Sequence, residues 1–98
     1  MMAKEKNYIL VTHFCQHANV EEDFIQNLNE YGLVLIEERN TESYIDENDI
    51  SKIEKLFRLY KDLSINYEGL DVINQMLQRI QQMDRRMKLL QQKLNLYE

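Results

Sequence analysis

The residues with the clearest potential for chemistry are two histidines and the single cysteine, which lie within five positions of one another. His13 and His17 are one helical turn apart, a spacing at which two imidazoles can bind one zinc ion. Cys15 lies between them, so in a helix its side chain points elsewhere. A zinc site needs further ligands, and a cysteine nucleophile needs an oriented base. The sequence therefore predicts no metal site, no cofactor and no enzymatic activity.

Charge divides the sequence into an acidic half and a basic half. Residues 1–49 hold three basic and eleven acidic side chains, a net charge of −8, whereas residues 50–98 hold nine and six, a net charge of +3. An acidic surface repels phosphates and attracts basic protein surfaces over roughly 8 to 10 Å. The residues expected to bind a partner are Glu21, Glu22, Asp23, Gln26, Asn29, Glu30, Glu37, Glu38 and Glu42. The alternative is an acidic face that is simply solvated.

Two short helices are expected to carry the first part of this acidic set. An apolar start, Tyr8–Val11, leads into a helix over Thr12–His17 that Thr12 caps. Asn19 is expected to cap a second helix over Val20–Tyr31, and Gly32 ends that helix in the left-handed conformation. The one- or two-residue joint between the helices is typical of a helix-turn-helix.

The second helix is amphipathic, so its spacing predicts which side chains face the core. Those expected to point inward are Val20, Phe24, Leu28 and Tyr31. Ile25 and Gln26 are expected to be exposed and to supply the dry centre of a protein contact.

A hairpin wing and a third helix follow. The run Leu33–Glu38 is rich in branched residues and predicts a strand, and Tyr44 and Ile45 form its short partner. Acidic residues mark the start of a helix over Asn48–Leu63. Its expected inward face consists of Ile50, Ile53, Leu56, Phe57, Tyr60 and Leu63. The residues from Ser64 to Gly69 break the pattern.

The longest helical signal runs from Glu68 to Tyr97, and its apolar residues recur every three or four positions. Such a helix is about 45 Å long, whereas a compact chain of this length has a radius of gyration of about 13 Å, so the distal half must project. A projecting apolar stripe needs a partner. We expect a homodimer interface formed by Ile73, Leu77, Ile80, Met83, Met87, Leu90 and Leu94.

The spacing of this stripe bears on how two such helices pair. A strict alternation of three and four would place Asp84 and Gln91 in the coiled-coil seam, but the sequence drops one step between Leu77 and Met83. We therefore expect a short antiparallel pairing, or packing on the partner's domain, rather than a long parallel coiled coil. The alternative is a monomer whose helix folds over its own core.

These elements make one small structural domain, with a winged helix-turn-helix module over residues 1–66 and a long C-terminal helix over 67–98. The fold class is mainly α. The sequence has no apolar run of the roughly 20 residues that a membrane span needs and no signal peptide at its start, so we expect a cytoplasmic protein.

This order of elements is similar to that of MerR-like winged helix-turn-helix proteins. Several stretches resemble the CbpM-type chaperone modulators, over about Val11 to Leu94: VTHFCQHANVEEDFI, EYGLV, RLYKDLSINYEGLDVI and the Gln-rich helix that follows. The third stretch is the most specific, whereas EYGLV is shared across the superfamily. The resemblance implies binding to the J-domain of a DnaJ/CbpA-like co-chaperone, whose second helix is typically basic, and inhibition of its stimulation of an Hsp70 chaperone.

The alternative within the same superfamily is a DNA-binding transcriptional regulator. The resemblance implies that DNA-binding members carry a phosphate-contacting Arg at the position that matches Gln26. Between Asn7 and Asp49 the sequence has one basic residue, Arg39, against ten acidic ones. Because Lys and Arg contacts to phosphate supply most non-specific DNA affinity, we expect no binding to DNA.

Overall fold

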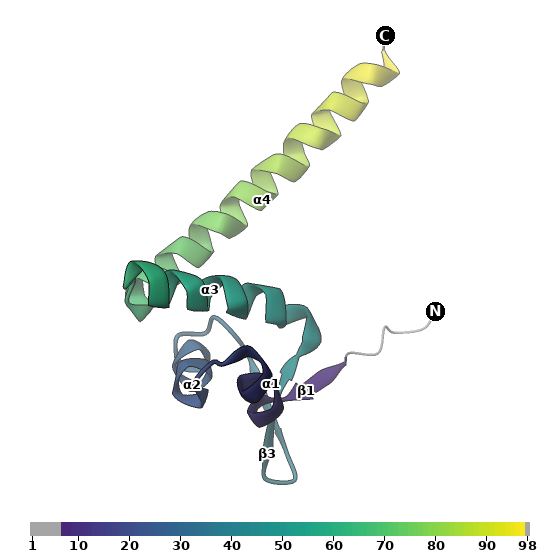
Figure 1. The fold of residues 1–98 in the computed structure, drawn as a ribbon. Helices are drawn as coiled ribbons and strands as arrows, with labels where there is room; N and C mark the ends of the chain where they lie inside the picture. Colours follow the sequence, from purple (N-terminus) through teal and green to yellow (C-terminus); the bar gives the residue numbers. More distant parts are fainter. Residues whose placement is uncertain (1–6, 98) are drawn as a thin grey trace.

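The computed structural model describes residues 7–97, which form a mainly helical chain with one small sheet (Figure 1). The strands are β1 (Tyr8–Leu10), β2 (Ile36–Arg39) and β3 (Glu42–Asp46). The helices are α1 (Val11–Ala18), α2 (Glu22–Glu30), α3 (Ile50–Leu63) and α4 (Tyr67–Leu96), and a short 3-10 helix spans Glu47–Asp49. The predicted fold class is confirmed at this level. Residues 1–6 and 98, at the ends of the predicted units 1–66 and 67–98, lie outside the described residues.

The three strands form one antiparallel sheet in which β3 lies between β1 and β2. Ile45 is its centre, because it pairs with Ile9 on one side and Ile36 on the other and is fully buried. The sequence pattern predicted a hairpin alone. That prediction was incomplete, because the apolar start forms β1 and pairs with β3, which is longer than the predicted pair of residues.

The first strand of the hairpin is also shorter than predicted. β2 begins at Ile36 rather than Leu33. Leu33 and Val34 precede it and are only 3% exposed each, because both pack into the core from an irregular segment. Burial, rather than strand pairing, accounts for the apolar character of these two residues.

The joint between α1 and α2 differs from the prediction in its cap. Asn19 was expected to cap the second helix, but it has a φ of 56° and ends α1 in the left-handed conformation, which Asn tolerates better than most residues. Thr12 lies inside α1, which begins at Val11. The prediction for Gly32 is confirmed, since its φ is 74° and the N–H of Leu33 donates to the carbonyl of Leu28 at 2.9 Å.

The core lies where α1, α2 and α3 meet the inner face of the sheet. Phe24 is at its aromatic side, with ring centroids 5.0 Å from Phe57 and 5.1 Å from Tyr60. Two predicted inward residues are not in the core, because Tyr31 is 38% exposed and Leu63 is 65% exposed. The buried apolar residues are Val11, Phe14, Cys15, Val20, Phe24, Ile25, Leu28, Leu33, Val34, Ile45, Ile53, Leu56 and Leu70.

A tight elbow joins α3 to α4. Ser64 ends α3 with a φ of 53°, and the side chain of Asn66 caps α4 by accepting a hydrogen bond from the N–H of Gly69 at 2.8 Å. A Cβ atom on Gly69 would lie 2.8 Å from Cγ2 of Ile65, so this position has no room for a side chain. Leu70, one residue later, is fully buried. The first turn of α4 is therefore fixed to the core.

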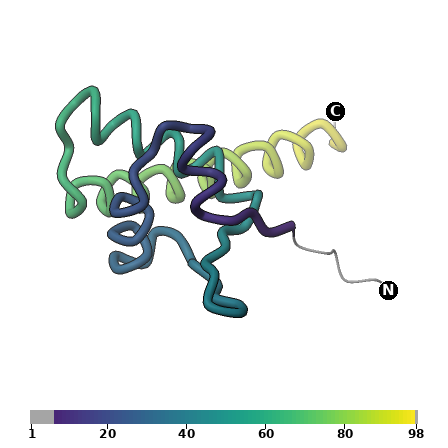
Figure 2. Tube along the Cα trace, turned by 60° about the horizontal axis from the view of Figure 1, so that its bottom comes forward, coloured from purple at the N-terminus to yellow at the C-terminus, as the bar shows by residue number. Residues whose placement is uncertain are grey.

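The rest of α4 leaves the globular part, which we call the module (β1 to α3 with the first turn of α4). Figures 1 and 2 show its distal turns, in yellow, extending past the other helices. The radius of gyration is 17.1 Å, against about 13 Å for a compact chain of this length. α4 is the longest helix described, yet no helix within residues 7–97 combines the length and the apolar character that crossing a membrane requires.

Candidate functional site

α2 separates its side chains into a buried face and an acidic face. The buried residues are Phe24, Ile25 and Leu28. Residues that are one, three or four positions apart in this way lie on the same side of a helix. The predicted partner-binding residues on α2 and at its start that are exposed are Glu21, Glu22, Asp23, Gln26 and Glu30. Three of these acids lie at the N-terminus of α2, where the helix dipole favours negative charge. The local structure thus accommodates the acids and keeps them in solvent.

A hollow of about 250 Å³ brings α2 and the hairpin together. Glu22, Gln26 and Glu42 line it, beside the first residues of α1 and beside Thr41 and Ser43. Three of the predicted partner-binding residues, from two separate elements, therefore share one concave surface. The residues that line the hollow include two acids and an amide, and Oε2 of Glu42 also accepts a hydrogen bond from the Tyr44 hydroxyl at 3.2 Å.

The hairpin acids divide between the two faces of the sheet. Glu37 accepts from Arg39 at 3.0 Å, and the Arg39 guanidinium lies 4.9 Å from the centre of the Tyr8 ring. Glu38 is on the opposite face by strand alternation, and it pairs with Ser43 of the hollow. Glu42 pairs with Arg39 across the strands, so alternation gives it the face of Glu37, but at the hairpin turn it also lines the hollow. We call Glu21, Glu22, Asp23, Gln26, Glu30, Glu38 and Glu42 the acidic face. Glu37, which is paired with Arg39, is not part of it.

Asn29 has a structural task. Its Oδ1 accepts a hydrogen bond from the backbone N–H of Ile36 at 3.1 Å, and the pair is partly buried. This bond fixes the start of β2 against the end of α2. This hydrogen bond within the chain explains why an asparagine is present at this position, and no binding to another protein is needed to explain it.

Ile25 does not have the exposed position that its place in the sequence pattern predicted. The Ile25 side chain is fully buried, because it lies on the side of α2 that packs against the rest of the core. The exposed apolar residue in this region is Leu35, which is 81% exposed and directly precedes β2. Sequence reasoning missed Leu35 because it lies in the uniformly apolar run Leu33–Ile36, in which no pattern marks one residue as exposed.

The histidine and cysteine group has no further ligands within reach among the described residues. The rings of His13 and His17 lie 4.6 Å apart, edge to face, and both residues are exposed. Burial raises the pKa of the Cys15 thiol, and the Glu22 carboxylate raises it further, so the thiolate is disfavoured. Within residues 7–97, no cluster of three His, Cys, Asp or Glu side chains has the geometry to hold a metal ion.

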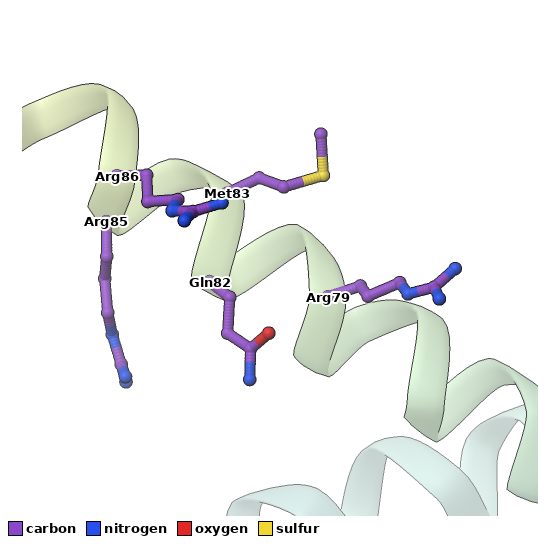
Figure 3. Close-up of a pocket in the computed structure, with 5 residues that line it drawn as sticks. All are labelled: Arg79, Gln82, Met83, Arg85 and Arg86. Carbon is purple, nitrogen blue, oxygen red and sulfur yellow. The ribbon is translucent and has the colours of Figure 1, made fainter. Parts of the chain in front are cut away.

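The apolar stripe of α4 changes character along the helix. Ile73 and Leu77 are half-buried. The distal members of the predicted interface are 59% to 64% exposed: Ile80, Met83, Met87, Leu90 and Leu94. Figure 3 shows Arg79, Met83 and Arg86 projecting to one side of α4, while Gln82 and Arg85 point away from them. A second candidate surface therefore lies on the projecting helix, remote from the acidic face.

Comparison with known proteins adds two findings. Residues 9–92 match the family model described as MerR HTH family regulatory protein. The chain is also 26% identical over 81 residues to the chaperone modulatory protein CbpM of Pseudomonas entomophila (strain L48), an alignment that covers 82% of this chain and 80% of that protein. Both descriptions are of regulatory or modulatory proteins, and neither describes an enzyme.

Proposed function

We propose that this protein is a chaperone modulator, because the chain belongs to the MerR HTH regulatory protein family and is of the CbpM type. The membership confirms the resemblance predicted from the sequence. In this proposal the acidic face binds the J-domain of a DnaJ/CbpA-like co-chaperone in the cytoplasm. A J-domain that is held in this way no longer stimulates its Hsp70 chaperone.

The observation that supports the proposal most directly is the hollow between α2 and the hairpin. Glu22 and Glu42 reach it from different elements, and both are exposed. Opposite charge on a partner raises the rate of encounter and fixes orientation, and the contribution falls as salt screens it. A basic helix is the partner that this charge distribution fits.

An apolar centre is the second part of the proposed contact. Strong protein contacts bury a few large side chains inside a polar rim. Leu35, at 81% exposure, is the most exposed large apolar residue of the module, and it takes the role that the sequence pattern had indicated for Ile25. We propose that the partner covers Leu35 while its basic side chains meet the acidic face.

The test is a titration of a purified J-domain with a double variant, Glu22→Lys with Glu42→Lys. We expect affinity to fall by about ten-fold or more, on the order of 1.4 kcal/mol, because like charges then face each other. The matched control is Glu54→Lys with Asp62→Lys. It makes the same change in net charge at two exposed positions of α3, outside the hollow, and should leave affinity within about two-fold, as distant surface changes usually do.

Two further measurements make this test decisive. Circular dichroism must show that both double variants keep the wild-type helix content. In a reconstituted assay, wild type should suppress co-chaperone stimulation of Hsp70 ATP hydrolysis and the hollow variant should not. Equal loss of binding in the two double variants would mean that only net charge matters, and no binding by wild type would contradict the proposal.

A DNA-binding regulator is the second candidate, because the family description allows it. The charge of the module argues against it. Arg39, the one basic residue between Asn7 and Asp49, is already paired with Glu37 at 3.0 Å. We expect no gel shift with random or promoter DNA at moderate salt. A salt-dependent shift at physiological ionic strength would reverse the ranking.

We also propose that the chain is a homodimer through the stripe of α4, with the module as the partner-binding unit. The exposed distal residues support this, since each Leu, Ile or Met that becomes fully buried contributes roughly 1.5 to 3 kcal/mol.

A further inference from the structure

α1 carries two histidines on its exposed side. His13 and His17 are four positions apart, so their side chains are neighbours on one face of the helix. Both residues are exposed, whereas Phe14 and Cys15 are turned into the core. Neither histidine belongs to the predicted partner-binding set or to the predicted dimer interface. The two imidazoles therefore form a separate pair that faces solvent.

The separation of the two rings matches that of two imidazoles bound to one metal ion. A metal–nitrogen bond of about 2.0 to 2.1 Å puts the centre of each ring about 3.2 Å from the ion. Two rings at adjacent corners of a square then have centres about 4.5 Å apart, against about 5.2 Å at two corners of a tetrahedron. The ring centroids of His13 and His17 lie 4.6 Å apart. Adjacent square-planar positions are the better match.

The orientation of the rings is what an ion would change. The two planes cross at 67°, with the edge of one ring toward the face of the other. The terminal torsion of a histidine is broad, so a ring turns at little cost. Among residues 7–97, no hydrogen bond or ion pair holds either imidazole in its present orientation. One nitrogen of each ring can thus turn toward a shared ion while the backbone of α1 stays in place.

The charge around the pair favours a cation. Between Asn7 and Asp49 there are ten acidic residues and one basic residue, and that Arg39 is paired with Glu37 at 3.0 Å. A surface of negative net charge raises the local concentration of cations. The charge of α2 also reaches α1, because the pKa of the Cys15 thiol is raised first by burial and then by the Glu22 carboxylate.

We propose that His13 and His17 form an exposed binding site for a divalent metal ion that prefers square-planar or tetragonal coordination by nitrogen, namely Cu²⁺ or Ni²⁺. The imidazoles take two adjacent positions, and water takes the others. The sequence-based prediction of no metal site rested on zinc, whose sites need further protein ligands. With two protein ligands and an open side toward solvent, this site binds its ion reversibly and does not hold the fold together.

The first test is calorimetric titration of the full chain with Ni²⁺ alone, an ion that the Cys15 thiol does not reduce. We expect saturable binding that depends on both histidines. His13→Gln and His17→Gln should each raise the dissociation constant at least ten-fold, because even the loss of a group that supports a metal ligand costs about 10- to 100-fold. Electron paramagnetic resonance of added Cu²⁺ should show a tetragonal ion with nitrogen ligands in wild type only.

Two matched variants test the spacing itself. Thr12→His with His13→Gln keeps two histidines in α1 but places them five residues apart, about 140° around the helix. This variant should bind Ni²⁺ as weakly as a single substitution. Thr12→His with Gln16→His, in a chain that also carries His13→Gln and His17→Gln, moves a pair with the original spacing by one residue. Since Thr12 and Gln16 are exposed, this variant should keep the fold and recover most of the affinity, with circular dichroism as the check.

The outcomes decide between this site and others on the chain. Loss of binding in both single variants and in the separated pair, with recovery in the moved pair, supports the proposal. Equal binding of Ni²⁺ by wild type and the single variants would place the ion elsewhere, such as on the acidic face, and would overturn it. Failure of wild type to bind millimolar Ni²⁺ or Cu²⁺ would also overturn it. Tighter binding of Zn²⁺ than of Cu²⁺ would overturn the tetragonal geometry. None of these measurements contains a J-domain, so their result leaves the proposed function to its own test.

Discussion

The module and the distal part of α4 show the same sequence pattern with opposite results. In α2 and α3 the apolar stripe is closed by the chain itself, so that Leu28 and Ile53 are 0% exposed and Leu56 is 1% exposed. In α4 the stripe from Met76 to Leu94 is more than half exposed. Periodicity therefore identifies a face that must be covered, but it does not identify the molecule that covers it.

The difference extends to what holds each helix in shape. α2 and α3 are stabilised by packing within the module, whereas the distal turns of α4 are supported by backbone hydrogen bonds and by few side-chain pairs, such as Asp84 with Lys88. Isolated helices are marginal in water. We therefore expect the stability of the module to be intramolecular and that of distal α4 to depend on protein concentration.

The largest expected effect compares the same substitution in the two regions. Leu56→Ala should lower the free energy of unfolding by about 2 to 5 kcal/mol, because it leaves a cavity in the core. Leu90→Ala should leave the unfolding of the module nearly unchanged and weaken only the dimer. Thermal melts at two protein concentrations measure this. An equal loss from the two substitutions in a monomer would show that α4 folds back on its own core.

A charge placed in the stripe should have the next largest effect. Met87→Glu would bury a carboxylate in the helix pair and cost about 2 to 4 kcal/mol of dimer stability, as unpaired charges in apolar contacts do. Gln92→Glu, on the far side of α4, is the control and should be neutral. Light scattering should report monomers for the first variant only. Dimers that persist in Met87→Glu would place the contact elsewhere on the chain.

A smaller effect is expected where the hairpin joins α2. Asn29→Ala removes the acceptor for the N–H of Ile36 and should cost about 1 kcal/mol of module stability. Asn29→Asp keeps an acceptor oxygen and should recover most of that loss. Chemical denaturation measures both. If Asn29→Ala lowers J-domain binding without lowering stability, Asn29 belongs to the partner contact as the sequence first indicated.

The smallest effect concerns the exposed hydrogen bond from the Tyr31 hydroxyl to the Glu68 carboxylate. This bond lowers the pKa of Glu68 and raises that of Tyr31. A lowered pKa in the folded state adds stability above the ordinary glutamate value of 4.5, and that stability is lost as pH falls through the folded value. Tyr31→Phe should raise the pKa of Glu68 toward its ordinary value, a change that NMR can follow, and the module should stay folded.

Much of the fold was accessible from sequence because short-range rules determine it. Gly32 was assigned a left-handed helix end, and that end is present. Asn19 was predicted to start the second helix, but it ends α1. Asn suits both a helix start and a left-handed helix end, and only the tight joint between α1 and α2 selects between them. β1 was missed as a strand because its three residues gain strand character only from the pairing with β3.

The candidate site was less accessible, because exposure depends on tertiary contacts. Ile25 and Leu35 are both apolar residues two positions from an acidic one, yet the first is 0% and the second 81% exposed. Met76 and Leu77 are adjacent, and only the position of α3 decides which of them is covered. Glu22 and Glu42 likewise line the same hollow only because the hairpin lies against α2. No local pattern contains this information.

The elbow at Gly69 has a mechanical consequence. A side chain there would collide with Ile65, and the Asn66 cap and the buried Leu70 hold the first turn of α4 against the core. α4 is therefore a rod about 45 Å long whose first turn is fixed in the module. A rotation of about 10° at this turn displaces the tip by roughly 8 Å. In the proposed dimer, the separation of the two modules would thus depend on a few atoms around one glycine. A bulkier residue at this position would change the spacing of the proposed binding faces without touching either of them.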